Sequence, residues 1–117
     1  MKELMEKIVK VLDEKKAVNI AAIEITELTI IADCFIVASG TSNTHIRALA
    51  EAVEDTLAKD GLEPKGIEGR ATGWILLDYG TVIVHLFLPD AREYYNLERL
   101  WADASKIDLS SVINGNQ

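Results

Sequence analysis

The sequence is poor in cysteine and in long apolar runs. Its one cysteine, Cys34, excludes an internal disulfide and a metal site built from several cysteines. No stretch approaches the roughly 18 consecutive apolar residues of a membrane-spanning helix, so we expect no membrane partner. Residues 1–16 alternate in charge and lack the apolar centre of a signal peptide, which predicts a cytoplasmic protein.

Basic residues are also few. The chain has 12 Lys and Arg against 19 Asp and Glu, a formal net charge of -7 and a pI near 4.7. Residues 1–16 hold 5 of the basic and 4 of the acidic groups, so residues 17–117 carry 7 and 15. Proteins that bind nucleic acids draw most of their affinity from Lys and Arg near phosphates. The acidic body therefore argues against direct nucleic-acid binding and favours approach to a basic protein surface.

The 117 residues fit one domain, and 49% of them are apolar, which is enough for a buried core. Apolar spacing and turn residues predict a helix over residues 4–12, strands over 18–25 and 33–38, a helix from the turn at 39–44 to Gly61, a short strand over 64–68, strands over 74–78 and 81–88, and a helix from a capping box at Asp90 and Glu93 through Trp101. This order predicts an α/β (α+β) fold, a mixed sheet flanked by helices, in a single domain over residues 1–102. Residues 103–117 form a C-terminal tail, whose apolar side chains we expect to dock on the body.

The strands over residues 74–78 and 81–88 predict a hairpin with Tyr79 and Gly80 in its turn, which pairs Trp74 with His85. Alternation puts aliphatic side chains on one face, which we expect to be core: Ile75, Leu77, Val82, Val84, Leu86 and Leu88. The other face mixes large apolar and polar side chains: Trp74, Leu76, Asp78, Thr81, Ile83, His85 and Phe87. No predicted helix is assigned to cover this mixed face.

Six of the seven aromatic residues lie between Trp74 and Trp101. Tryptophan and tyrosine are concentrated at the centres of protein interfaces, but they also fill ordinary cores. Both interpretations stay open for the aromatic group as a whole. The mixed face favours an interface role for Trp74.

Some features invite a catalytic interpretation. The turn at Gly40, Thr41 and Ser42 has the composition of a phosphate-binding loop at a helix N-terminus. Nucleotidyltransferases with such a turn follow it with two metal-binding carboxylates one residue apart, and no such pair occurs in this chain, so a helix cap is the better explanation. Cys34 lies in an apolar run, where a thiol is usually inert, and the two histidines lack zinc-ligand spacing. We expect no catalytic residue, no metal and no cofactor.

Three blocks, in this order, carry a family resemblance: residues 32–42 (ADCFIVASGTS), residues 73–85 with GWILLDYG and VIVH, and residues 92–101 (REYYNLERLW). Together they resemble the ribosomal silencing factor family, also called RsfS or Iojap, over residues 4–101. The resemblance implies a nucleotidyltransferase-like fold without the catalytic carboxylates, and a protein that is not an enzyme. It also implies binding to the large ribosomal subunit through large-subunit ribosomal protein fourteen, which blocks joining of the small subunit and represses translation when nutrients are scarce.

The resemblance implies partner-binding roles for Trp74, Leu76, Asp78 and Tyr95. The geometry of the mixed face adds Ile83, His85 and Arg92 to the predicted partner-binding residues. Two alternatives stay open. One is residual nucleotide binding at residues 40–44, and the other is a homodimeric adaptor that uses the mixed face to bind a second copy.

Overall fold

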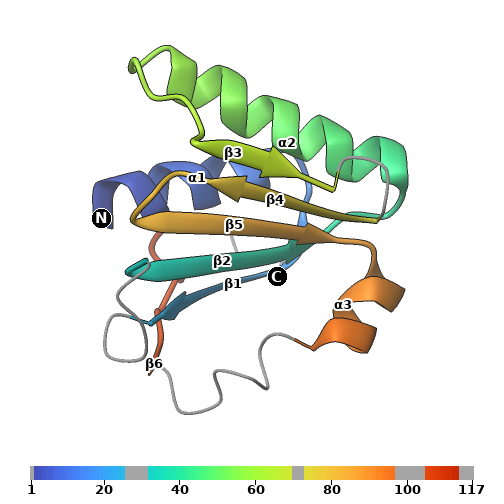
Figure 1. Ribbon diagram of the computed structural model, residues 1–117. Coiled ribbons are helices and arrows are strands. Elements are labelled where there is room, and N and C mark those ends of the chain that lie inside the picture. The colour runs from blue at the N-terminus through green and yellow to red at the C-terminus, as the bar shows by residue number, and fades with distance from the viewer. Residues whose placement is uncertain (1, 26–31, 70–72, 97–104, 114–117) are drawn as a thin grey trace.

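The computed structural model describes residues 2–25, 32–69, 73–96 and 105–113. Within these residues the elements follow one another in this order (Figure 1): α1 (Lys2–Glu14), β1 (Val18–Glu24), β2 (Cys34–Ser39), α2 (Asn43–Ala58), β3 (Gly66–Glu68), β4 (Trp74–Asp78), β5 (Val82–Phe87), α3 (Pro89–Tyr95) and β6 (Ser105–Lys106). Each element that the sequence predicts is present, and the structure adds the short strand β6.

The described strands form one mixed sheet in the order β3-β4-β5-β2-β1-β6. β2 and β5 lie side by side at its centre and run parallel, whereas the other neighbouring pairs are antiparallel. Parallel neighbours need a long crossover connection, and here α2, β3 and β4 supply it. The predicted fold class, a mixed sheet flanked by helices, is confirmed.

α1 and α2 cover one face of the sheet (Figure 1). Apolar side chains at helical spacing, such as Ile8 and Leu12 on α1 and Leu49 and Val53 on α2, are fully buried in this layer. The strand side chains buried with them include Cys34, Ile36, Ala38, Ile75, Leu77, Val82, Val84 and Leu86. The predicted core face of the hairpin is therefore confirmed.

The β4–β5 hairpin differs from the prediction in its pairing. Trp74 lies opposite Phe87 and not opposite His85, so the predicted pairing was wrong by two residues. The turn lies one residue later than predicted, at Gly80 and Thr81, and Gly80 adopts a left-handed φ of 85° that glycine reaches without strain. A shift of two residues leaves every side chain on its original face. The mixed face is therefore the one predicted.

The last helix is shorter than predicted. α3 begins at Pro89, and its N-cap is Leu88 instead of Asp90, so the predicted capping box was wrong. Proline is favoured in the first turn because its missing N–H has no partner there anyway. α3 ends at Tyr95, because Asn96 adopts a left-handed φ of 43°. The remainder of the predicted helix, residues 97–101, lies outside the described residues.

The C-terminal tail contributes to the sheet and to the core. β6 pairs antiparallel with β1 at the edge of the sheet. Leu109 is buried, and Ile107, Val112 and Ile113 pack partly against the layer that contains α1 and α2. The expected docking of the tail is confirmed.

Close packing explains the glycine in the turn between β2 and α2. α2 follows Ser42, whose Oγ accepts a hydrogen bond from the backbone N–H of His45 at 3.0 Å, as the predicted helix cap requires. A Cβ atom at Gly40 would lie 2.6 Å from Cγ2 of Ile46, which is fully buried. The packing of the helix start against the turn therefore requires a residue without a side chain.

We expect Gly40→Ala to lower the free energy of unfolding by about 1–3 kcal/mol, because the buried Ile46 has to move. The matched control is Gly66→Ala in β3, where a Cβ meets nothing within 4 Å and the backbone is not left-handed. The control is expected to change the stability by less than about 1 kcal/mol. Urea unfolding followed by circular dichroism measures both variants, and equal losses would contradict the packing explanation.

Candidate functional site

The second face of the sheet carries the predicted mixed face. Strand pairing arranges its side chains in three rows across the sheet, in turn Asp78, Ile83, Phe35 and Ile23; Leu76, His85, Val37 and Ala21; and Trp74, Phe87, Ser39 and Val18. We call this surface the open face. Among the helices that the structure describes, only α3 packs against it, at the end of β5 (Figure 1).

The open face has a buried floor formed by β5. Ile83, His85 and Phe87 are only 8%, 4% and 0% exposed. Half-buried side chains from the strands on either side pack around them, above all Phe35 from β2 and Trp74 from β4. Two of the predicted partner-binding residues, Ile83 and His85, therefore lie beneath the side chains of their neighbours.

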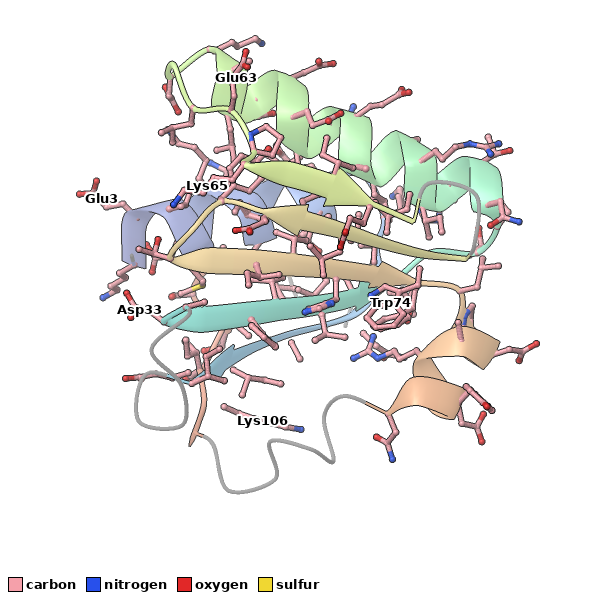
Figure 2. The ribbon with its side chains drawn as sticks, in the orientation of Figure 1. Glu3, Asp33, Glu63, Lys65, Trp74 and Lys106 are labelled. Atoms are coloured by element: carbon pink, nitrogen blue, oxygen red, sulfur yellow. The ribbon has the colours of Figure 1, made fainter. Side chains whose placement is uncertain are left out.

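Trp74 is held by two residues of β5. Its ring stacks on Phe87 with the ring centroids 5.0 Å apart and an interplanar angle of 27°. Its Nε1–H donates a hydrogen bond to Nδ1 of His85 at 3.1 Å. Figure 2 shows Trp74 at the end of the sheet that faces α3. The half-buried indole thus has a defined position on the open face.

His85 lies at the centre of the open face and is neutral at physiological pH. Burial lowers the pKa of His85 from 6.5 to about 4. The ring of Phe35 lies 4.8 Å away, centroid to centroid, at an angle of 59°. Because Nδ1 accepts the bond from Trp74, the hydrogen-bond network assigns the proton to Nε2. Nε2 is buried and has no hydrogen-bond partner within the described residues.

Leu76 and Asp78 lie on the β4 side of the open face, and both are half-buried. Oδ1 of Asp78 accepts a hydrogen bond from the backbone N–H of Gly80 at 2.8 Å, which stabilises the hairpin turn. Glu68, an exposed residue of β3, pairs with Leu76 across the strands. This side of the apolar surface therefore carries negative charge.

The structure gives Arg92 an intramolecular role. Its Nη1 donates a hydrogen bond to Oγ of Ser39 at 3.0 Å and lies 3.5 Å from the carbonyl oxygen of Val18. These contacts fasten α3 to the ends of β1 and β2. Tyr95 is the last residue of α3, and its side chain lies outside the described part of the structure. Partner binding by the seven residues named from the sequence stays a prediction.

Phe35 also belongs to this surface, and it is not among the residues predicted from the sequence. Alternation along β2 places Phe35 and Val37 on one face, but only the parallel pairing with β5 brings Phe35 beside Ile83. Tyr94 on α3, which is 82% exposed, is likewise absent from the predicted residues. For Phe35, the available signal was an aromatic residue at an alternate position of a central strand, but the sequence does not show which strand lies beside it.

Internal hydrogen bonds engage three backbone N–H groups at the turn between β2 and α2. The backbone N–H of Gly40 donates to the carbonyl of Phe87 at 2.9 Å. The N–H of Thr41 donates to Nδ1 of His45, also at 2.9 Å, and the N–H of His45 is used by the helix cap. A phosphate bound here would need such donors. A phosphate bound here could use these three donors only by breaking the bonds that they already make.

Cys34 and His45 have structural explanations. Cys34 is fully buried, which confirms that it packs in the core, and burial raises the pKa of its thiol from 9.0 to about 11. His45 joins the end of α1 to the turn, because its Nε2 lies 3.0 Å from the carbonyl oxygen of Lys15.

The described residues contain no group of three or more potential metal ligands. None of the described helices combines the length and the apolar character that a membrane span requires.

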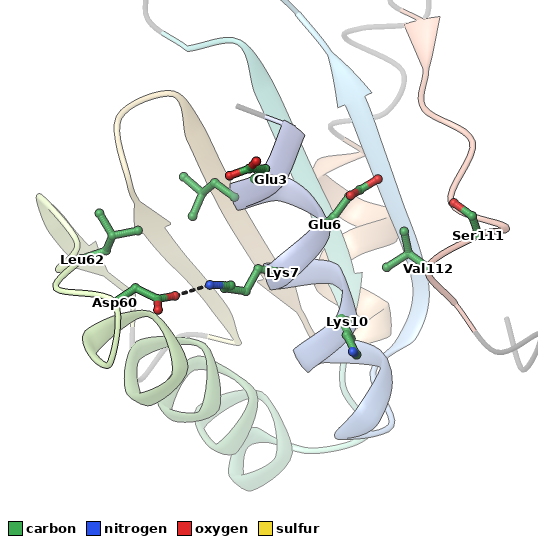
Figure 3. Close-up of a pocket in the computed structure, with 9 residues that line it drawn as sticks. Glu3, Glu6, Lys7, Lys10, Asp60, Leu62, Ser111 and Val112 are labelled. Carbon is green, nitrogen blue, oxygen red and sulfur yellow. Dashed lines mark hydrogen bonds and ion pairs between the residues drawn. The ribbon is translucent and has the colours of Figure 1, made fainter.

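A hollow of about 940 Å³ lies between α1, the segment that follows α2 and the tail (Figure 3). Lys7 on α1 forms an ion pair with Asp60 on one side of it, and both side chains are more than 40% exposed. Leu62 and Val112 also line it. Exposed charges of both signs beside a few aliphatic side chains are typical of solvated surface. None of the predicted site residues lies there.

The buried neutral His85 predicts a pH-dependent stability. Its pKa is about 4 in the folded chain and 6.5 without burial, so the unfolded chain binds more protons between these values. We expect the free energy of unfolding to contain the full contribution of neutral His85 above about pH 6.5. This contribution is expected to fall by up to about 3 kcal/mol as the pH drops to about 4. Urea unfolding of the unaltered protein and of His85→Phe, from about pH 7 to about pH 5, measures this difference. A difference that does not change with pH would contradict the expectation.

Comparisons with known proteins agree on one family. A family model described as "Ribosomal silencing factor during starvation" matches residues 1–117. The chain is 38% identical over 113 residues to the ribosomal silencing factor RsfS of Halalkalibacterium halodurans, which covers 96% of this chain and 97% of that one. It is 33% identical over 100 residues to the chloroplastic protein Iojap of Zea mays, which covers 86% of this chain and 44% of that one.

The fold is shared as well. A crystal structure of a Chromobacterium violaceum protein matches with a TM-score of 0.84 at 35% identity and covers 87% of this chain and 86% of that one. A crystal structure from Bacillus halodurans matches with a TM-score of 0.83 at 34% identity and covers 93% of this chain and 100% of that one. The resemblance carried by the three sequence blocks is confirmed, and the chain belongs to the ribosomal silencing factor family, RsfS.

Proposed function

We propose that this protein binds the free large ribosomal subunit through large-subunit ribosomal protein fourteen and uses the open face to do so. The bound protein occupies space that the small subunit needs, so the subunits do not join and translation falls, above all when nutrients are scarce. The proposed site of action is the cytoplasm. Family membership supports ribosome association and translation regulation. The mechanism is steric and requires no chemical step.

The half-buried apolar surface around Trp74 is the observation that carries the proposal. Phe35, Trp74 and Leu76 stand beside a buried floor on the face opposite α1 and α2. Protein interfaces combine aromatic anchors near their centre with a polar rim. The open face has this arrangement, with Asp78 and Glu68 at its edge.

Charge supports a basic protein as the partner. Residues 17–117 carry 7 basic and 15 acidic groups, and this excess of negative charge disfavours binding to ribosomal RNA. Long-range attraction to a basic ribosomal protein raises the rate of encounter and weakens with salt. Asp78 keeps acceptor capacity beyond its bond to Gly80, so its carboxylate can pair with a Lys or Arg of the partner.

We expect Trp74→Ala to weaken binding to purified large subunits by at least about tenfold, because aromatic anchors carry much of the binding free energy of an interface. Leu76→Ala removes a smaller apolar area and is expected to weaken binding by about threefold to tenfold. Cosedimentation with large subunits over a range of protein concentrations measures both affinities.

The matched control is Leu62→Ala, which removes the same atoms as Leu76→Ala. Leu62 is 43% exposed, follows α2 and lines the hollow beside α1, away from the open face. Its replacement is expected to leave the affinity unchanged, and circular dichroism checks the fold of all three variants. Unchanged cosedimentation of both open-face variants would overturn the proposal. A mass in light scattering that rises with concentration and is lost in Trp74→Ala, without any binding to large subunits, would assign the open face to a second copy instead.

A further inference from the structure

His85 presents a conflict between packing and hydrogen bonding. Its imidazole is 4% exposed and lies among the rings of Phe35, Trp74 and Phe87. Within the described residues, its Nε2 is buried without a hydrogen-bond partner. A buried donor without a partner destabilises the folded state, so a phenylalanine would be more stable in these surroundings. The histidine therefore needs an explanation other than packing.

The second nitrogen of the ring supplies this explanation. Nδ1 accepts a hydrogen bond from Nε1–H of Trp74 at 3.1 Å. An imidazole accepts only through a nitrogen that carries no proton, so this bond requires the neutral ring with its proton on Nε2. The unpartnered Nε2–H is thus the direct consequence of using Nδ1 as an acceptor.

Trp74 occupies a place where its orientation needs such a restraint. It is the first residue of β4 and follows Gly73, whose φ of 77° lies in the left-handed region. The stack on Phe87 restrains the tilt of the indole, but flat ring contacts permit sliding within the plane. The hydrogen bond from Nε1–H to His85 restrains the rotation of the indole within its plane, because such bonds weaken steeply away from linearity.

We propose that His85 is the positioning residue of the open face, which holds the indole of Trp74 in the orientation that the protein partner binds. This inference rests on the proposed function. A side chain that is already ordered loses less rotamer freedom on binding, so the interface gains affinity. His85 is 4% exposed under Trp74 and Phe35, so the proposal replaces the direct partner contact predicted for His85 from the sequence with a role that acts through Trp74.

The first test uses the free protein and NMR spectroscopy. The chain has two tryptophans, so the variant Trp74→Phe identifies the indole signal of Trp74. We expect the ring ¹⁵N shifts of His85 to report a proton on Nε2, a measurement that needs no variant of His85. The indole N–H of Trp74 is expected to exchange with solvent roughly five- to tenfold faster in His85→Phe than in the unaltered protein. A proton on Nδ1, or equal exchange in the two proteins, would overturn the inference.

The second test is a double-mutant cycle for binding to purified large subunits. We expect His85→Phe to weaken binding roughly three- to tenfold, and Trp74→Phe, which removes the donor but keeps an aromatic ring, to weaken it at least as much. In the Trp74→Phe background, His85→Phe is expected to cause no further loss. Additive losses would overturn the positioning role, because they would indicate that His85 contacts the partner directly.

Two controls separate positioning from folding. His45→Gln replaces the other histidine, which bonds to the turn and to the end of α1, and is expected to bind large subunits normally. His85→Phe is expected to unfold at the same or a higher urea concentration than the unaltered protein at neutral pH. The variant removes the buried unpartnered donor, whereas the indole N–H that it releases belongs to the half-buried Trp74 and can bond to water. If the unaltered protein fails to bind large subunits, the proposed function fails, while the NMR measurements still decide the role of His85.

Discussion

The parallel pairing of β2 and β5 is the constraint on which both faces of the sheet depend. It places Phe35 beside Ile83 and Ser39 beside Phe87, and the other strands add to this pair as antiparallel neighbours. Alternate side chains of these two strands then enter either the layer under α1 and α2 or the open face. A slip of one residue in this register would exchange the two sets and expose the core.

The two faces of the sheet differ in the side chains that they bury. The layer under α1 and α2 consists of aliphatic side chains, among them Ile8, Leu49 and Leu77, whose burial supplies most of the hydrophobic stabilisation. The open face keeps groups that a core would exclude, namely the unpartnered Nε2 of His85 and the half-buried indole of Trp74. Such local conflicts persist at functional surfaces because the rest of the fold supplies enough stability.

The turn between β2 and α2 shows how a structural requirement can imitate a catalytic motif. Its Gly, Thr and Ser match the composition of a phosphate-binding loop at a helix N-terminus. In the fold, Gly40 is required by the close approach of Ile46, Ser42 caps α2, and the N–H of Thr41 is bound to His45. Composition alone does not distinguish the two uses, because both need small residues and a helix start.

The sequence by itself determined the type of each main element and the face of each side chain in the β4–β5 hairpin. Trp74, Leu76 and His85 share a face because alternation is a property of the local backbone. The register of the hairpin and the end of α3 were not predictable from the sequence, since they depend on the left-handed conformations of Gly80 and Asn96.

Only the tertiary structure decided which strands are neighbours outside the β4–β5 hairpin. It thereby decided the place of Phe35 beside β5, the strand β6, and the bond between Trp74 and His85. The physical reason is that local geometry sets where a side chain points, whereas its partners come from the packing of segments far apart in the chain.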